Sequence, residues 1–154
     1  MAEFDFLRPT DKPALLALST MEYLATCKSI LHEMDYKVHQ SSDHEEFVSR
    51  FGQIQYQIAI LEERFSCGSI EENLALMRLQ YMPMGLRRHS LTILIGESFQ
   101  SLNTMQAFQQ SVHVVINPTD LASLKQILQQ SIADNDLFLT VYRDTQFRLA
   151  QGKI

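Results

Sequence analysis

The sequence predicts an α/β fold, a single domain built on a doubly wound parallel sheet of five strands. Short apolar runs alternate along the chain with segments whose apolar residues recur at helical spacing. Repeated strand–helix units of this kind build a parallel sheet with helices on both faces. One run, from Ile58 to Leu61, is apolar at every position and ends at Glu62 and Glu63. A continuous run suits a strand buried on both faces, so we expect it at the centre of the sheet.

Size and composition are those of a soluble globular protein. A chain of 154 residues can form one compact domain, and a hydrophobic content of 45% with 20% charged residues argues against disorder. The net charge of −5 disfavours nucleic-acid binding, because phosphate contacts need a basic surface. No apolar stretch approaches the roughly 18 to 20 residues that cross a bilayer, so we expect no membrane segment.

Cysteine and histidine usage points to a reducing compartment and to no metal site. Cys27 and Cys67 lie far apart in the sequence, form no C-x-x-C pair and follow no signal peptide. We therefore expect a cytoplasmic protein without a disulfide framework. Cys27 shares a helical stripe with Leu24 and Leu31, which indicates a small buried side chain. The histidines have no metal-ligand spacing.

The first half of the chain predicts two further strands and two helices around the central strand. Residues 14–18 are all apolar, and residues 37–40 form a shorter, more polar strand at an edge of the sheet. Each precedes a helix start of the form S-x-x-E, in which the serine and glutamate side chains bond the free amides of the first turn. These capping boxes are residues 19–22 and 42–45. Gly52 is expected to end the second helix in the left-handed conformation.

The second half of the chain predicts two more strands and three more helices. In order, these elements lie at residues 69–83, 90–95, 99–110, 112–116 and 121–150. The first helix of this group begins with a third capping box. The last strand of the group, residues 112–116, is rich in β-branched residues. No proline or glycine interrupts the final segment, so a continuous helix there would extend about 45 Å at 1.5 Å per residue.

The order and local patterns of these elements resemble the receiver domains of bacterial response regulators. Residues 12–18 look like their first strand, residues 56–62 resemble their third, and Asn117-Pro118 is similar to their Lys-Pro pair. The resemblance implies the CheY-like, flavodoxin-like fold with strand order 2-1-3-4-5, in a bacterial signalling protein. It divides the chain into a lead-in at residues 1–11, a receiver-like domain at 12–133 and a C-terminal helical extension at 134–154.

The residues that carry phosphorylation in receivers are mostly replaced in this chain. Ser19 and Thr20 stand where receivers place two acidic residues that hold Mg²⁺. Glu62 replaces the phosphate-accepting aspartate, Ile95 the hydroxyl residue of the fourth strand, and Asn117 the lysine of the fifth. The resemblance also implies that Pro118 keeps a structural role, since the peptide bond before this proline is commonly cis in the family.

These replacements predict a degenerate pseudo-receiver that is not an enzyme, binds no cofactor or metal and accepts no phosphate. Phosphoryl transfer needs a divalent cation and positive charge beside the transferring oxygens. Hydroxyl groups are poor Mg²⁺ ligands, isoleucine forms no hydrogen bond, and asparagine brings only a dipole. An alternative is that Glu62 mimics a permanently phosphorylated aspartate; the plainer interpretation makes it a solvated carboxylate at a strand end.

A flavodoxin-like, cofactor-binding protein is the other alternative, because its fold is similar. Its phosphate loop should be rich in serine, threonine and glycine, so that backbone amides can face the phosphate. Ser19 and Thr20 fit this pattern. However, the loop contains no glycine, and Glu22 would repel the anion.

The C-terminal extension is the expected working surface. It carries more apolar surface than one domain edge needs, and its candidate interface residues are Leu137, Phe138, Val141 and Tyr142. The extension either folds back over the body or projects as a helix that binds a protein partner, including a second copy of this chain.

Overall fold

A computed structural model describes residues 7–87 and 89–152, so most of the predicted lead-in, residues 1–6, lies outside the described residues. Five parallel strands form one sheet in the order β2-β1-β3-β4-β5, which confirms the predicted fold class and strand order. In chain order the strands are β1 Pro13–Ala17, β2 Lys37–Gln40, β3 Ile58–Glu62, β4 Leu91–Ile95 and β5 Val114–Ile116. Strand β3 lies in the middle, as its apolar run predicts.

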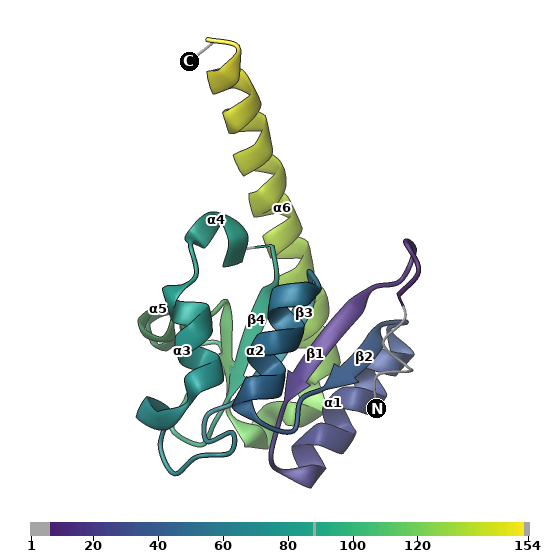
Figure 1. The fold of residues 1–154 in the computed structure, drawn as a ribbon, viewed down its shortest axis with the longest axis vertical. Helices are drawn as coiled ribbons and strands as arrows, with labels where there is room; N and C mark the ends of the chain where they lie inside the picture. The colour runs from purple at the N-terminus through teal and green to yellow at the C-terminus, as the bar shows by residue number, and fades with distance from the viewer. Residues whose placement is uncertain (1–6, 88, 153–154) are drawn as a thin grey trace.

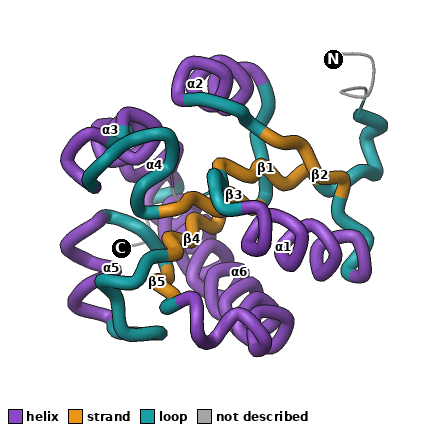
Figure 2. Tube along the Cα trace, turned by 90° about the horizontal axis from the view of Figure 1, so that it is seen from below, coloured by secondary structure: helices purple, strands orange, loops and turns teal. Residues whose placement is uncertain are grey.

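Helices cover both faces of the sheet (Figure 2). In chain order they are α1 Met21–Glu33, α2 His44–Gln53, α3 Leu74–Tyr81, α4 Met84–Arg87, α5 Thr104–Gln110 and α6 Leu124–Ala150. Helices α1 and α6 share one apolar cluster with Ile58 and Ile60 of β3, whereas α2, α3 and α5 share the other with Ala59 and Leu61. Alternate side chains of β3 therefore point into two separate cores.

Helix starts differ from the predicted capping boxes. The side chain of Thr20, the N-cap of α1, forms no cap hydrogen bond. At α2 the cap is Asp43, whose carboxylate accepts the Glu46 amide at 2.8 Å. At α3 the cap is Asn73, because residues 70–72 form a separate 3₁₀ turn. Gly52 does not end α2 and is not left-handed; the helix runs to Gln53.

Helix α5 is shorter than predicted, and its apolar residues face outward. It begins only at Thr104, because Leu102 adopts a left-handed φ of 65° and its amide donates to the Val115 carbonyl at 2.9 Å. Met105 and Phe108 are 62% and 78% exposed, and the side chain that α5 buries is Ala107. The preceding loop thus uses its backbone to hold β5.

The short helix α4 has no counterpart in the sequence-based prediction. Arg87, its last residue, is buried, and its guanidinium donates to the carbonyl oxygens of Leu79 and Gln80 at 3.2 and 3.3 Å. These carbonyls belong to the last turn of α3, where the dipole favours a cation. One long side chain therefore ties α4 to the helix before it.

Helix α6 confirms the predicted extended C-terminal helix and projects from the domain instead of folding back (Figure 1). Leu124, Ile127 and Leu128 pack against the sheet, and Leu139 is a last buried residue. The hydroxyl of Tyr142 lies close to Gly85 of α4, 3.9 Å from where a side chain there would begin. In the described part of the chain, no helix has the length and apolar character needed to cross a membrane.

Because Cys27 of α1 is buried, the reactivity of its thiol tests how this helix packs. The Cys27 side chain is fully buried, and burial raises its pKa to about 12. Because the thiolate is the reactive form, we expect Cys27 to resist a disulfide-exchange reagent at pH 8. A colorimetric thiol titration should count only Cys67 in the folded protein and both cysteines in denaturant. Two reactive thiols in the folded protein would contradict this packing.

Candidate functional site

The carboxyl ends of the strands form the edge of the sheet where ligands collect in open α/β folds. Of the five predicted pocket positions, the structure brings Ser19, Thr20 and Glu62 into direct contact. Ile95 and Asn117 lie at the ends of the neighbouring strands β4 and β5 and take part in other interactions.

The Glu62 carboxylate is bound by the start of α1. One oxygen, Oε1, accepts the backbone amides of Ser19 and Thr20 at 2.8 and 2.9 Å. The other, Oε2, accepts the Thr20 hydroxyl at 2.7 Å. Glu62 is half-buried, and both of its carboxylate oxygens accept hydrogen bonds within the chain, which the plainer interpretation did not include. A glutamate side chain is one methylene longer than that of aspartate, so Glu62 reaches from the end of β3 to the loop between β1 and α1.

This geometry explains why the S-x-x-E pattern at residues 19–22 failed. The Thr20 hydroxyl, at the N-cap of α1, donates to Glu62 from 42 residues away and does not bond the amides of the first turn. The Glu62 carboxylate also lies beside the partial positive charge of this helix N-terminus, which favours it there. Ser19 instead accepts the Ser66 amide with its hydroxyl oxygen at 2.9 Å.

The side chain of Asn73 holds the loop after β3 next to Glu62. The side-chain amide of Asn73 donates to the carbonyl oxygens of Glu62 and Glu63 at 2.9 and 3.2 Å, while its oxygen accepts the Leu76 amide. Asn73 is fully buried. A buried asparagine that spans a loop carries no distinctive sequence signal, and sequence reasoning missed it.

Glu63 points elsewhere and packs over Gly96. Its backbone amide donates to the Ile95 carbonyl at 2.8 Å, and its carboxylate accepts the Ser98 amide at 3.4 Å. A Cβ atom at Gly96 would lie 2.7 Å from the Cβ of Glu63, which is closer than such contacts allow. Glycine at position 96 is therefore required by close packing, and the two adjacent carboxylates do not form a pair.

Asn117 closes the end of β5. Its Nδ2 donates to the Phe99 carbonyl at 2.8 Å, and its Oδ1 accepts the amide and hydroxyl of Thr119. The Ser101 hydroxyl accepts the Asn117 amide at 2.8 Å. No cis peptide bond occurs among residues 7–87 and 89–152, so the bond before Pro118 is trans.

Negative charge remains at the mouth of this region. Burial raises the pKa of the Tyr23 phenol, and the carboxylates of Glu97, Glu62 and Glu22 raise it further.

Ile95 is fully buried in the apolar core. Within the part of the chain that the structure describes, no group of three histidine, cysteine or acidic side chains could hold a metal ion.

The four candidate interface residues of the extension are exposed. Leu137, Phe138, Val141 and Tyr142 expose 67%, 49%, 57% and 37% of their surface, and the rings of Phe138 and Tyr142 stack with centroids 6.5 Å apart. Leu139 lies between them in sequence but faces the body and is buried. The sequence pattern did not separate this anchoring residue from its neighbours.

Solved structures share this fold at low sequence identity, while no protein-family model and no curated protein matches the chain. A CheY-like receiver domain from Methanospirillum hungatei matches with a TM-score of 0.63 and 16% identity, over 82% of this chain and 98% of its own. A receiver domain from Methylobacillus flagellatus matches with a TM-score of 0.58 and 16% identity, over 79% and 99%. These similarities establish the receiver-domain fold.

A third structure also matches most of the long helix. It is a fusion that carries a trimeric coiled-coil segment of yeast Spc42, with a TM-score of 0.63 and 11% identity. The match covers 96% of this chain and 94% of the fusion.

Replacing Glu62 with alanine tests the contact with α1. The change removes three hydrogen bonds to a charged acceptor, and we expect it to lower the free energy of unfolding by about 1–3 kcal/mol. Glu22→Ala is the matched control, because Glu22 lies exposed in the first turn of the same helix and should cost less than about 1 kcal/mol. Chemical denaturation measures both variants. Equal stability losses would show that the Glu62 contact contributes nothing specific.

Proposed function

We propose that this chain is a pseudo-receiver, a non-enzymatic regulatory module that binds protein and works without phosphorylation. The observation that carries the proposal is the Glu62 carboxylate, which is held by two backbone amides and one hydroxyl at the start of α1. The receiver-domain fold suggests a signalling role, and the chemistry at its strand ends argues against a phosphate-dependent one.

The contacts of Glu62 leave little for a metal ion or a phosphoryl group to bind. Mg²⁺ needs oxygen ligands in octahedral geometry, usually one or two carboxylates with several waters. Here the carboxylate of Glu62, at the end of β3, already accepts three hydrogen bonds. The Thr20 hydroxyl donates one of them, and the Ser19 hydroxyl accepts the Ser66 amide. A transferring phosphoryl group would also find the buried Ile95 at the end of β4.

The same contacts favour this proposal over both alternatives. A mimic of phosphorylated aspartate should reach the groups that end β4 and β5, but the bonds of Glu62 run to the loop after β1. A flavin phosphate would need the amides at the start of α1, and Glu62 occupies two of them.

The exposed face of α6 is the surface that the proposal assigns to binding. Helix α6 projects beyond the sheet (Figure 1), and its residues Leu137, Phe138 and Val141 are between 49% and 67% exposed. Exposed apolar patches of this kind mark protein interfaces. The matched fusion with a trimeric coiled coil supports self-association through such a helix by analogy.

Titration with Mg²⁺ and beryllofluoride tests independence from phosphorylation. Because Glu62 is already bonded and the residue directly after β5 is Asn117, not a lysine, we expect the amide NMR resonances of residues 19, 20 and 62 to stay unchanged. Incubation with acetyl phosphate should add no mass to the protein. Saturable shifts confined to those three resonances would overturn the proposal.

Substitutions at two positions around α6 test the binding surface. Val141→Asp places a charge on the proposed face, whereas Phe147→Asp places one about 120° around the helix from it, at similar exposure, 57% against 62%. We expect the full chain to form dimers in sedimentation experiments and Val141→Asp to raise the dissociation constant at least tenfold. Phe147→Asp should change it less than threefold. Equal effects, or a chain that is monomeric at all concentrations, would contradict self-association through this face.

A further inference from the structure

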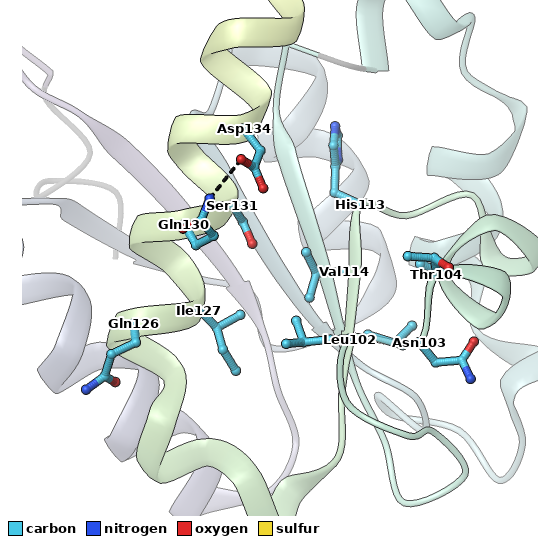
Figure 3. A pocket seen from close by; sticks show the side chains of 12 residues that line it. Leu102, Asn103, Thr104, His113, Val114, Gln126, Ile127, Gln130, Ser131 and Asp134 are labelled. Atoms are coloured by element: carbon cyan, nitrogen blue, oxygen red, sulfur yellow. Dashed lines mark hydrogen bonds between the residues drawn. The ribbon is translucent and has the colours of Figure 1, made fainter.

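A groove runs along the outer edge of the sheet between α5, β5 and the first half of α6 (Figure 3). Its main cavity has a volume of about 530 Å³ and is lined by Leu102, Val114 and Ile127 among apolar residues, with Ser131 and Asp134 on its α6 wall. A second cavity continues it past His113 as far as Phe138. The groove therefore leads directly to the exposed part of the helix.

One face of α6 carries both the wall of this groove and the exposed apolar residues. Residues spaced three and four apart share a face of a helix. Such a stripe runs through positions 127, 131, 134, 138, 142, 145 and 149. Its spacings are 4-3-4 before Phe138 and 4-3-4 after it, so the stripe is symmetric about that residue.

The residues at matching places on the two sides of Phe138 are chemically complementary. Ile127 and Leu149 are both apolar and lie about 17 Å from Phe138 along the helix at 1.5 Å per residue. Ser131 and Thr145 are both hydroxyl residues, so either can donate to the other. Asp134 is matched by Tyr142, whose hydroxyl can donate to a carboxylate.

We infer that two copies of this chain pair with their α6 helices antiparallel about Phe138, so that the C-terminal half of each α6 docks in the groove of the other. Leu149 then lies beside Leu102 and Ile127 of the second copy, and Tyr142 lies opposite Asp134 of the second copy. This inference rests on the proposed self-association and adds its geometry. A two-fold axis requires a self-complementary surface, and this stripe provides one.

The exposed surface approaches the area that such a pairing needs. Leu102 and five residues of α6 (Leu137, Phe138, Val141, Tyr142 and Leu149) are between 37% and 67% exposed. At roughly 200 Å² for a large side chain, they offer on the order of 600 Å² of mainly apolar surface per copy. The polar residues of the stripe add to this, and a stable interface needs about 800 Å² per partner.

A parallel pair would use the same face less well. It would set Asp134 against Asp134 of the second copy and Ser131 against Ser131, and like charges directly opposed are destabilising. It would also leave the groove beside β5 uncovered. Antiparallel pairing removes the carboxylate contact and brings the half of α6 that carries Arg148 toward Asp134.

Cysteine cross-linking of the full chain distinguishes the two arrangements. In a Cys67→Ser background, which leaves only the buried Cys27, one preparation carries Ser131→Cys and another carries Thr145→Cys. Mixed and oxidised, they should form a disulfide-linked dimer that contains one chain of each. Neither should cross-link alone, because like positions lie about 21 Å apart along the paired helices. Phe138→Cys should cross-link alone and serves as the positive control.

A nitroxide label at Thr145→Cys gives an independent measurement by electron paramagnetic resonance. The distance between the labels of a dimer should exceed about 20 Å, against about 10 Å for parallel helices, which pack 8–10 Å apart. A dimer that cross-links through Thr145→Cys alone, or that shows the short distance, overturns the antiparallel arrangement while self-association stands. A chain that stays monomeric removes the proposed self-association and this inference with it.

Discussion

The bonds between the Glu62 carboxylate and the amides of Ser19 and Thr20 join the centre of the sheet to the loop that leads into α1, although Thr20 lies 42 residues from Glu62 in the sequence. They place a carboxylate beside a helix N-terminus, where negative charge is favoured, and they fix the loop after β1. That loop in turn receives the Ser66 amide on Ser19, so the loop after β3 is positioned as well. A single side chain thus determines how two adjacent loops meet at the edge of the sheet.

Three polar side chains at other strand ends follow the same principle and are bonded or packed within the chain. Asn117 holds the loop after β4, Asn73 holds the backbone after β3, and Glu63 covers Gly96. Such contacts hold this edge of the sheet together, in keeping with the proposed independence from phosphorylation. The projecting helix α6 exposes apolar side chains that other molecules could contact.

The fold could be predicted from sequence because its signals are local and strong. Apolar runs such as Ile58 to Leu61 identify buried strands, and alternation with helices leaves few topologies. Helix ends were less predictable, because serine, aspartate and asparagine serve as caps or bond distant groups with no difference in sequence. Glu62 is the clearest example: its partners lie in the loop after β1, and only the assembled sheet brings them together.

Apolar spacing was similarly ambiguous where it did not reach the core. Met105 and Phe108 on α5 fit a helical pattern yet face solvent, since the loop before α5 uses Leu102 to bond β5 and delays the helix. On α6, Leu139 is buried and its neighbours are not, although all belong to one apolar run. A pattern shows that a face is apolar, and only tertiary structure shows what covers it.

The unbroken course of α6 gives the domain a lever. Its 27 residues measure about 40 Å, and its buried residues lie between Leu124 and Leu139. If the base rotates by about 5°, the far end sweeps through roughly 3 Å, comparable to the radius of a side chain. A small rotation of the base of α6 near β5, too slight to alter the sheet, would therefore displace the far end of the helix. That displacement would change the register between helices that pack together there.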